Sequence, residues 1–197
     1  MLVGFAGASC TGKTTLVNAV YEKLKKQRYN VAMLKEVARW VFEQYFSSYK
    51  SLDELREDKD AYYRFQKYVY GGQIQLENEL LYQYDIVLTD RTVFDNLLYT
   101  ITYCDVRDIF KLFKTLPAFG RERYDIIFLC MPVNAESCRD TFRSQNDVGL
   151  REYHTYLLYN WFKGWKNVAM LSGKITLEER VYNVIKTIQR WKRGNLL

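Results

Sequence analysis

The first fourteen residues constrain the fold of this chain more than any other segment. A short apolar run from Leu2 to Ala6 precedes GASCTGKT, Gly7 to Thr14, which matches the phosphate-loop pattern G-x-x-x-x-G-K-[ST]. Glycine permits backbone angles and close approaches that a side chain would block. The backbone N–H groups of such a loop can surround phosphate oxygens at a helix start, where the helix dipole favours an anion. The motif therefore predicts a strand, a nucleotide-binding loop and a helix, in that order.

Two side chains of the loop extend this prediction to ATP and Mg²⁺. Lys13 can reach the outer phosphates of a triphosphate, and the Thr14 hydroxyl can ligate Mg²⁺. A tight turn between a strand and a helix would explain the glycines, but it would not explain Lys13 followed by Thr14. The predicted nucleotide-binding residues are Gly7, Ser9, Cys10, Thr11, Gly12, Lys13, Thr14 and Thr15.

Short apolar runs recur along the chain and alternate with helical patterns. They lie at 2–6, 31–34, 86–89, 126–130 and 168–171. The alternation predicts a single α/β domain over 1–197, with a parallel sheet covered by helices on both faces. In such sheets, ligands bind beyond the carboxyl ends of the strands.

Helical periodicity and capping signals place the helices between these runs. We expect helices near 13–28, 37–49, 51–84, 93–103, 106–115, 151–164 and from 176 onward. Ser51 and Thr176 each open a capping box. Gly71 and Gly72 interrupt the long stretch at 51–84, which indicates either a kink or the close approach of a ligand.

Polar residues follow the second and third apolar runs, at the edge where ligands are expected. Phosphoryl transfer needs a metal, charge neutralisation and an oriented nucleophile. Asp90 is the natural carboxylate to share Mg²⁺ with Thr14, and Glu36 is placed to accept a proton from an attacking hydroxyl. Simpler roles stay open, because Glu36 could pair with Arg39, Asp90 could cap a helix and Arg91 could form a surface ion pair.

Several short motifs together resemble one family of P-loop kinases. They are the loop at 7–14, Glu36-Val-Ala-Arg39, Phe65-Gln66, Asp90-Arg91 and the later Asp147 to Arg151. The chain resembles the nicotinamide riboside kinase-like group, close to the deoxynucleoside and nucleoside-monophosphate kinases, over roughly residues 1–190. The resemblance implies the P-loop NTPase fold, with five parallel strands in the order 2-3-1-4-5 and a lid segment at about 131–151.

The resemblance also implies roles for individual residues. Glu36 would orient the acceptor hydroxyl, Arg91 would hold the acceptor near the transfer site, and Asp90 would be the acid beside the metal. Gln66 resembles a glutamine that binds the base of a nucleoside, although a glutamine on a helix surface stays an alternative and Gln73 is an equal rival. The implied substrate-binding residues are Glu36, Arg39, Gln66, Gln73 and Arg91, and the implied lid arginines are Arg139, Arg143 and Arg151.

Composition narrows the class of protein further. The net charge of +6 suits a polyphosphate ligand and also suits nucleic acid, although the basic residues at 186–193 are expected to form a solvated helix face. The four cysteines form no C-x-x-C pair, so we expect reduced thiols and a cytoplasmic location. Because the chain has a single histidine, His154, histidine-based catalysis and histidine-rich metal sites are not expected, and we expect His154 to be an ordinary surface residue. We expect no leader and no membrane span, and the sequence leaves a homodimer open.

Three functions remain to be weighed. The first is an ATP- and Mg²⁺-dependent kinase that phosphorylates a hydroxyl or phosphate of a nucleoside- or nucleotide-like small molecule. The second is a kinase acting on a nucleic-acid hydroxyl, at a 5′ end or on a base-borne hydroxymethyl group. The third is a regulatory NTPase without a small acceptor, which would not need Glu36, Asp90 and Arg91 together. An enclosed pocket walled by residues 62–73 would favour a small molecule, whereas an open basic groove leading to Glu36 would favour a polymer.

Overall fold

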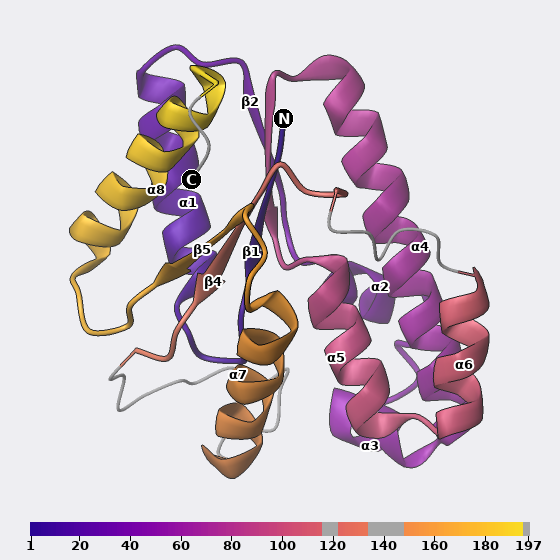
Figure 1. The fold of residues 1–197 in the computed structure, drawn as a ribbon. Coiled ribbons are helices and arrows are strands. Elements are labelled where there is room, and N and C mark those ends of the chain that lie inside the picture. The colour runs from indigo at the N-terminus through magenta and orange to yellow at the C-terminus, as the bar shows by residue number, and fades with distance from the viewer. Residues whose placement is uncertain (116–121, 134–147, 195–197) are drawn as a thin grey trace.

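The computed structural model describes residues 1–115, 122–133 and 148–194, and it contains one five-stranded parallel sheet. The strands are β1 (Leu2–Ala6), β2 (Val31–Leu34), β3 (Ile86–Asp90), β4 (Ile126–Cys130) and β5 (Val168–Leu171). Their order is β2-β3-β1-β4-β5 (Figure 1), so the predicted fold and strand order are confirmed. Because all strands are parallel, their carboxyl ends share one edge, and the phosphate loop, Glu36 and Asp90 all lie there.

Helices cover both faces of the sheet (Figure 1). One face packs against α1 (Lys13–Lys26) and α8 (Leu177–Lys192). The other packs against α4 (Lys59–Gln83), α5 (Val93–Tyr103), α6 (Val106–Thr115) and α7 (Val148–Phe162). Side chains alternate between the two faces along each strand, so Val3 and Phe5 contact the first layer and Leu2 and Ala6 the second.

A separate apolar cluster holds two short helices against α4, beyond the edge of the sheet. These are α2 (Val37–Tyr45) and α3 (Leu52–Glu57), and the cluster includes Val41, Leu55 and Phe65. α2 begins directly after β2. The cluster therefore fixes α2, α3 and α4 as a wall beside the carboxyl ends of β2 and β3.

The structure corrects the expected helix at 51–84. Ser51 caps α3 as predicted, by accepting a hydrogen bond from the Glu54 N–H at 3.2 Å. The chain then breaks at Asp58, which adopts an extended conformation and caps α4 by accepting from the Ala61 N–H at 2.9 Å. A side chain that caps a helix competes with helix continuation, which is why one stretch becomes two helices.

α4 continues across Gly71 and Gly72 without interruption. A Cβ on Gly72 would lie 3.3 Å from Val37 Cγ1, so this glycine allows α2 to approach closely, whereas a Cβ on Gly71 would meet nothing within 4 Å.

The bounds of two other helices also differ from expectation. α2 ends at Tyr45, because the chain turns to bury Phe46, and α7 begins at Val148, within the segment expected to be a lid.

His154 is buried, so the prediction of a surface histidine is wrong. Its side chain is 1% exposed, and its Nε2 lies 2.9 Å from the Thr102 hydroxyl, between α7 and α5. Among the described cysteines, Cys104 and Cys130 are free thiols, as predicted, whereas Cys10 forms a disulfide, contrary to the prediction. In the part of the chain that the structure describes, no helix combines the length and apolarity needed to cross a membrane.

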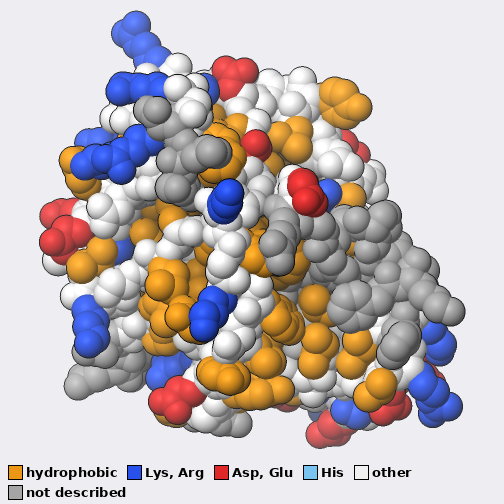
Figure 2. Space-filling model, in the orientation of Figure 1, with side chains coloured by type: hydrophobic (Ala, Val, Ile, Leu, Met, Phe, Trp, Pro, Cys, Tyr) orange, Lys and Arg blue, Asp and Glu red, His pale blue; other side chains and the backbone are white. Residues whose placement is uncertain are grey.

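Part of the positive charge lies at the end of the sheet opposite the phosphate loop. α1 and α8 run back from the carboxyl edge, and their last turns carry Lys23, Lys25, Lys26, Arg190 and Lys192. Figure 2 shows Lys and Arg side chains gathered at the upper left, where these helices end in Figure 1. Cations are favourable at helix C-termini, so this charge stabilises helix ends and lies away from the site.

Candidate active site

The phosphate loop joins β1 to α1 with the backbone geometry that its motif predicts. Gly12 has a φ of 73° and Cys10 a φ of 59°, both in the left-handed region. A Cβ on Gly7 would lie 2.7 Å from the Cys130 carbonyl oxygen, so only glycine fits against β4 there. Ser9 is half-buried in the loop and Thr15 is exposed on the first turn of α1.

The Lys13 ammonium is held inside the loop. Its Nζ donates to the carbonyl oxygens of Gly7 at 2.7 Å and Ala8 at 2.6 Å, and to the Thr11 hydroxyl at 3.1 Å. The side chain is only 5% exposed. Burial, and next the positive charge of Arg91, lower the pKa of Lys13 from 10.5 to about 8. Lys13 is thus a buried cation whose partners are neutral oxygens, which phosphate oxygens can replace.

Thr14 and Asp90 lie together, as the predicted metal site requires. The Thr14 hydroxyl donates to Asp90 Oδ2 at 2.6 Å, and Asp90 is 6% exposed at the end of β3. Mg²⁺ prefers oxygen ligands and is commonly held by one or two protein groups together with phosphates and water. A hydroxyl and a carboxylate oxygen beside the phosphate loop fit this requirement.

Arg91 connects the loop region to Glu36. Its Nε donates to Glu36 Oε1 at 2.7 Å, and its Nη1 lies 3.6 Å from Asp95 Oδ1. Its guanidinium also lies over the Tyr99 ring, 5.3 Å from the centroid. The backbone of Arg91 has a φ of 99°, a strained conformation for a residue with a side chain. Such strain persists only where the surroundings impose it.

Buried hydrogen bonds from Thr89 and Gln73 hold the Arg91 backbone in this conformation. The Arg91 carbonyl oxygen accepts from the Thr89 hydroxyl at 2.7 Å and from Gln73 Nε2 at 3.3 Å. Gln73 Nε2 also donates to Thr89 at 2.6 Å and to Glu77 at 2.7 Å. The amide nitrogen of Gln73 is thus committed to the protein, so the prediction that Gln73 rivals Gln66 for a base does not fit its contacts. Gln73 supports Arg91.

Glu77 anchors this network although it is fully buried. It forms an ion pair with Arg123 and accepts from the Tyr124 hydroxyl at 2.9 Å. Burial raises the pKa of Glu77, and the charge of Arg123 opposes that rise. The Tyr124 hydroxyl also accepts from the Val93 N–H at 2.9 Å, at the start of α5. Glu77 therefore supports both Arg91 and the first turn of α5.

Asp95 is a site residue that the sequence analysis missed. It is 1% exposed, and its Oδ1 accepts from the Gly7 N–H at 3.1 Å, the first amide of the phosphate loop. Its Oδ2 accepts from the Thr92 N–H at 2.9 Å and from the Thr92 hydroxyl at 2.8 Å. Thr92-x-x-Asp95 is a capping box directly after a buried strand, so the pattern that identified Ser51 and Thr176 could have found it.

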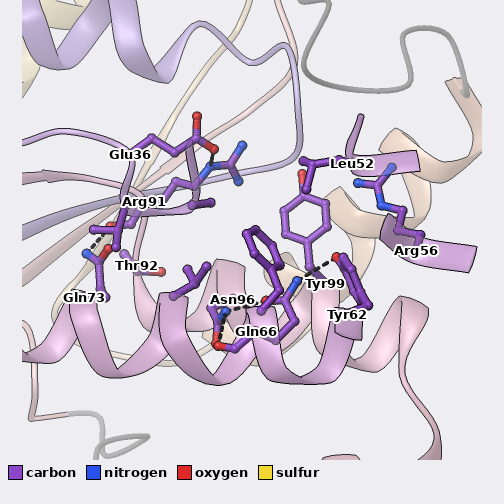
Figure 3. Close-up of a pocket in the computed structure, with 14 residues that line it drawn as sticks. Glu36, Leu52, Arg56, Tyr62, Gln66, Gln73, Arg91, Thr92, Asn96 and Tyr99 are labelled. Atoms are coloured by element: carbon purple, nitrogen blue, oxygen red, sulfur yellow. Dashed lines mark hydrogen bonds and ion pairs between the residues drawn. The ribbon is translucent and has the colours of Figure 1, made fainter. Parts of the chain in front are cut away.

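A narrow pocket opens beside Glu36 and is walled by α2, α3, α4 and α5 (Figure 3). The pocket is tight, because only about 50 Å³ within it can be occupied by the centres of water-sized molecules. Its polar lining includes Glu36, Tyr62, Gln66, Gln73, Arg91 and Asn96. Figure 3 shows the Glu36–Arg91 pair at one end and the amides of Gln66 and Asn96 beside Tyr62 at the other.

Gln66 is buried and lies inside this pocket, not on the helix surface. Its Nε2 donates to the Tyr62 hydroxyl at 2.6 Å, and its Oε1 accepts from Asn96 Nδ2 at 2.5 Å. A primary amide has a second N–H and a second lone pair, which remain for a paired contact with a base edge. The Asn96 Oδ1 is buried without a hydrogen-bond partner among the described residues, and it adds an acceptor to the same end of the pocket.

The structure does not bring every predicted residue into the pocket. Arg39 is exposed on α2 and is not among the lining residues. Arg151 is half-buried on α7, within a helix and not in a loop. Arg139 and Arg143 lie outside the described residues, as does most of the predicted lid.

Fold and site together define a P-loop protein with the fold of P-loop kinases. More particularly, the chain belongs to the family described as AAA domain, whose model matches residues 2–180. No curated protein sequence matches the chain. The predicted resemblance to P-loop kinases is confirmed at the level of the fold.

Two solved structures illustrate this fold. Deoxyadenosine kinase from M. mycoides, with the products dCMP and a flexible dCDP bound, is 11% identical with a TM-score of 0.63, covering 96% of this chain and 99% of that one. NadR in complex with NR is 23% identical with a TM-score of 0.68, covering 96% of this chain and 50% of that one. The chain therefore spans about half the length of NadR.

Proposed function

We propose that this protein is an ATP- and Mg²⁺-dependent phosphotransferase that transfers the γ-phosphoryl group to a hydroxyl of a nucleoside- or nucleotide-like acceptor. One observation carries the proposal: Arg91 lines the pocket beside Glu36 and also contacts Asp95, which binds the first amide of the phosphate loop. The phosphate loop, which would bind the phosphate donor, and the acceptor pocket thus meet at the ion pairs that Arg91 forms with Glu36 and Asp95.

Each residue of the cluster has a separate task in this reaction. Glu36 orients the acceptor hydroxyl and accepts its proton, while Arg91 holds the acceptor and the Glu36 carboxylate. The acceptor oxygen bonds to the γ-phosphorus as the bond to the β–γ bridging oxygen breaks. Lys13 moves from the loop carbonyls to the phosphates and neutralises charge that develops there. Thr14 and Asp90 would hold Mg²⁺, which when bound would neutralise further charge on the phosphate oxygens.

The solved structures with this fold support a nucleoside-like acceptor, because deoxyadenosine kinase holds dCMP and dCDP and NadR holds NR. The pocket supports it through Gln66 and Asn96, which offer amide groups to a base edge. α4 forms one wall of the pocket through Tyr62, Phe65, Gln66, Val69 and Gln73, which supports a small-molecule acceptor. The cytoplasmic location and the homodimer remain predictions.

One observation favours a nucleic-acid strand as a second candidate acceptor. An open groove between α2 and α4 shares Glu36 and Val37 with the acceptor pocket. It is lined by the exposed rings of Trp40, Tyr45 and Tyr68, together with Lys35 and Lys67. Exposed aromatic rings beside basic side chains are typical of surfaces that bind single strands.

A ligand screen followed by a transfer assay tests both candidates. Nucleosides, nucleotides and short oligonucleotides are screened by thermal shift with an unreactive ATP analogue, because a true acceptor stabilises the native state. Hits are then incubated with γ-labelled ATP and Mg²⁺. Transfer to a small molecule, with affinity that changes little with salt, supports the first candidate, and transfer to oligonucleotides with a steep salt dependence supports the second. ATP hydrolysis at one rate with every compound, without transfer, would contradict both and indicate a regulatory NTPase.

A further inference from the structure

Arg180 lies against the phosphate loop although it comes from the first turns of α8. Its side chain is 2% exposed, and its Nη1 donates to the Thr11 carbonyl oxygen at 3.1 Å. A Cβ built on Gly12 would lie 3.3 Å from the same nitrogen. No local sequence pattern predicts this contact, since the two partners are 169 residues apart.

This arginine is poorly placed to stabilise the fold. Among the described residues, its buried Nε and Nη2 have no hydrogen-bond partner and no carboxylate forms an ion pair with it. A buried charge costs free energy unless it is paired and its hydrogen bonds are satisfied. A residue that is unfavourable for stability and yet touches a functional loop points to a role in that loop.

The contact determines which way one peptide group of the loop faces. The Thr11 carbonyl and the Gly12 N–H belong to the same peptide group, and all described peptide bonds are trans. In a planar trans peptide these two groups point in opposite directions. Holding the Thr11 carbonyl toward Arg180 therefore directs the Gly12 N–H away from Arg180.

Without such a contact this peptide could rotate at little cost. Gly12 has no side chain, so both signs of φ are sterically accessible to it. A rotated peptide would replace an N–H donor with a carbonyl oxygen, which repels phosphate. The carbonyls of Gly7 and Ala8 have a different partner, because they accept from Lys13. The Thr11 carbonyl bonds to Arg180 instead.

We propose that Arg180 is a positioning residue of the donor site, which fixes the Thr11–Gly12 peptide so that the Gly12 N–H can bind a phosphate oxygen. The proposal rests on the proposed function in that the loop must bind a triphosphate. It assigns Arg180 no direct contact with the nucleotide, and its effect on binding passes through the orientation of one amide.

Binding measurements on three variants test the proposal. Arg180→Met removes the donor, Arg180→Lys keeps a charged donor, and Arg190→Met is the control because Arg190 is exposed on the same helix. The probes are an unreactive ATP analogue and inorganic tripolyphosphate, which lacks a base. We expect Arg180→Met to weaken binding of both probes about tenfold to a hundredfold, as for loss of a hydrogen bond from a charged group. Arg180→Lys should recover most of this loss, and the control should bind normally.

Two further readouts separate positioning from a purely structural role. The thermal midpoint of Arg180→Met without ligand should equal or exceed that of the wild type, because an incompletely paired buried charge is removed. In amide NMR spectra, the Gly12 signal should shift on tripolyphosphate binding in the wild type and in Arg180→Lys, but not in Arg180→Met. A lower midpoint with no rescue by lysine would overturn the proposal, as would an unchanged Gly12 response. Should Arg180→Met fail to fold, Arg180→Gln, which keeps an uncharged donor, is used in its place.

The outcomes also separate this proposal from the proposed function. If the wild type binds neither probe, the donor site itself is wrong. If the wild type binds both and Arg180→Met binds them equally well, only the positioning role is wrong. A loss confined to the ATP analogue would indicate a contact with the base and would overturn the assignment to the phosphate loop.

Discussion

Lys13 provides a quantitative test of the phosphate-loop geometry, through the substitution Lys13→Met. Burial, and then the charge of Arg91, lower the pKa of Lys13 from 10.5 to about 8. At about 1.4 kcal/mol per pKa unit, the charged lysine costs the folded state about 3 kcal/mol. Methionine has a similar length and no charge, so the variant does not carry this cost.

The cost depends on pH in a defined direction. Below pH 8 the lysine is protonated in both states and the whole cost is present. As the pH rises, the folded protein releases this proton near pH 8, whereas the unfolded chain keeps it until about 10.5. The unfolded state then binds more protons, so wild-type stability rises with pH relative to the variant. Between pH 7 and pH 9.5, this difference in proton binding raises the free energy of unfolding of the wild type by about 2 kcal/mol relative to the variant.

Urea denaturation of both proteins at pH 7 and pH 9.5 measures this effect. The buffers must be free of phosphate, which would bind the loop and stabilise the native state. At one pH the comparison also includes the lost hydrogen bonds to Gly7 and Ala8, but the change with pH comes from ionisation alone. We expect the free energy of unfolding of Lys13→Met minus that of the wild type to fall by about 2 kcal/mol. Lys163→Met, at an exposed position, is the control and should show no such change. A difference that stays constant with pH would refute the burial of a charged Lys13.

Three further predictions concern the acceptor side. Glu36→Gln should lower kcat by a factor of about 10²–10⁴ and change the acceptor KM much less, as for loss of a general base. If kcat is unchanged and only stability falls, Glu36 is the partner of Arg91 and not a catalytic base. Gln66→Ala should raise the acceptor KM in steady-state kinetics and leave the ATP KM unchanged, and an equal rise in both would argue against base recognition. Glu77→Gln should destabilise the fold by about 2–3 kcal/mol in urea denaturation, less than for a fully buried pair because Arg123 keeps some exposure. It should also lower kcat because Arg91 loses support, and the double variant Glu77→Gln/Arg123→Met should regain most of the stability but not the kcat.

The phosphate loop and the polar residues that follow the strands could be predicted from the sequence because their signals are local. A phosphate loop requires particular residue types within eight positions, and a parallel sheet brings the residues after each strand to one edge. Thr14, Glu36, Asp90 and Arg91 could be placed by these two rules alone. Capping signals at Ser51 and Thr176 are local in the same way. Thr176 forms the predicted capping box, and Ser51 caps α3, although the Glu54 carboxylate accepts from the Lys50 N–H and not from that of Ser51.

The rest of the site was decided by tertiary contacts between distant parts of the chain. Gly7 meets Asp95 across 88 residues, and Thr11 meets Arg180 across 169. Gln73 and His154 are ordinary residues within helical patterns, and only packing determined that one supports Arg91 and the other is buried against α5. Periodicity shows which helix face is apolar, but it does not show which polar side chain on that face finds a partner. Whether a polar side chain finds a partner depends on where the other helices lie. The sequence by itself therefore determined the phosphate loop and the edge of the sheet that holds the site. Only the folded structure determined which side chains support that site.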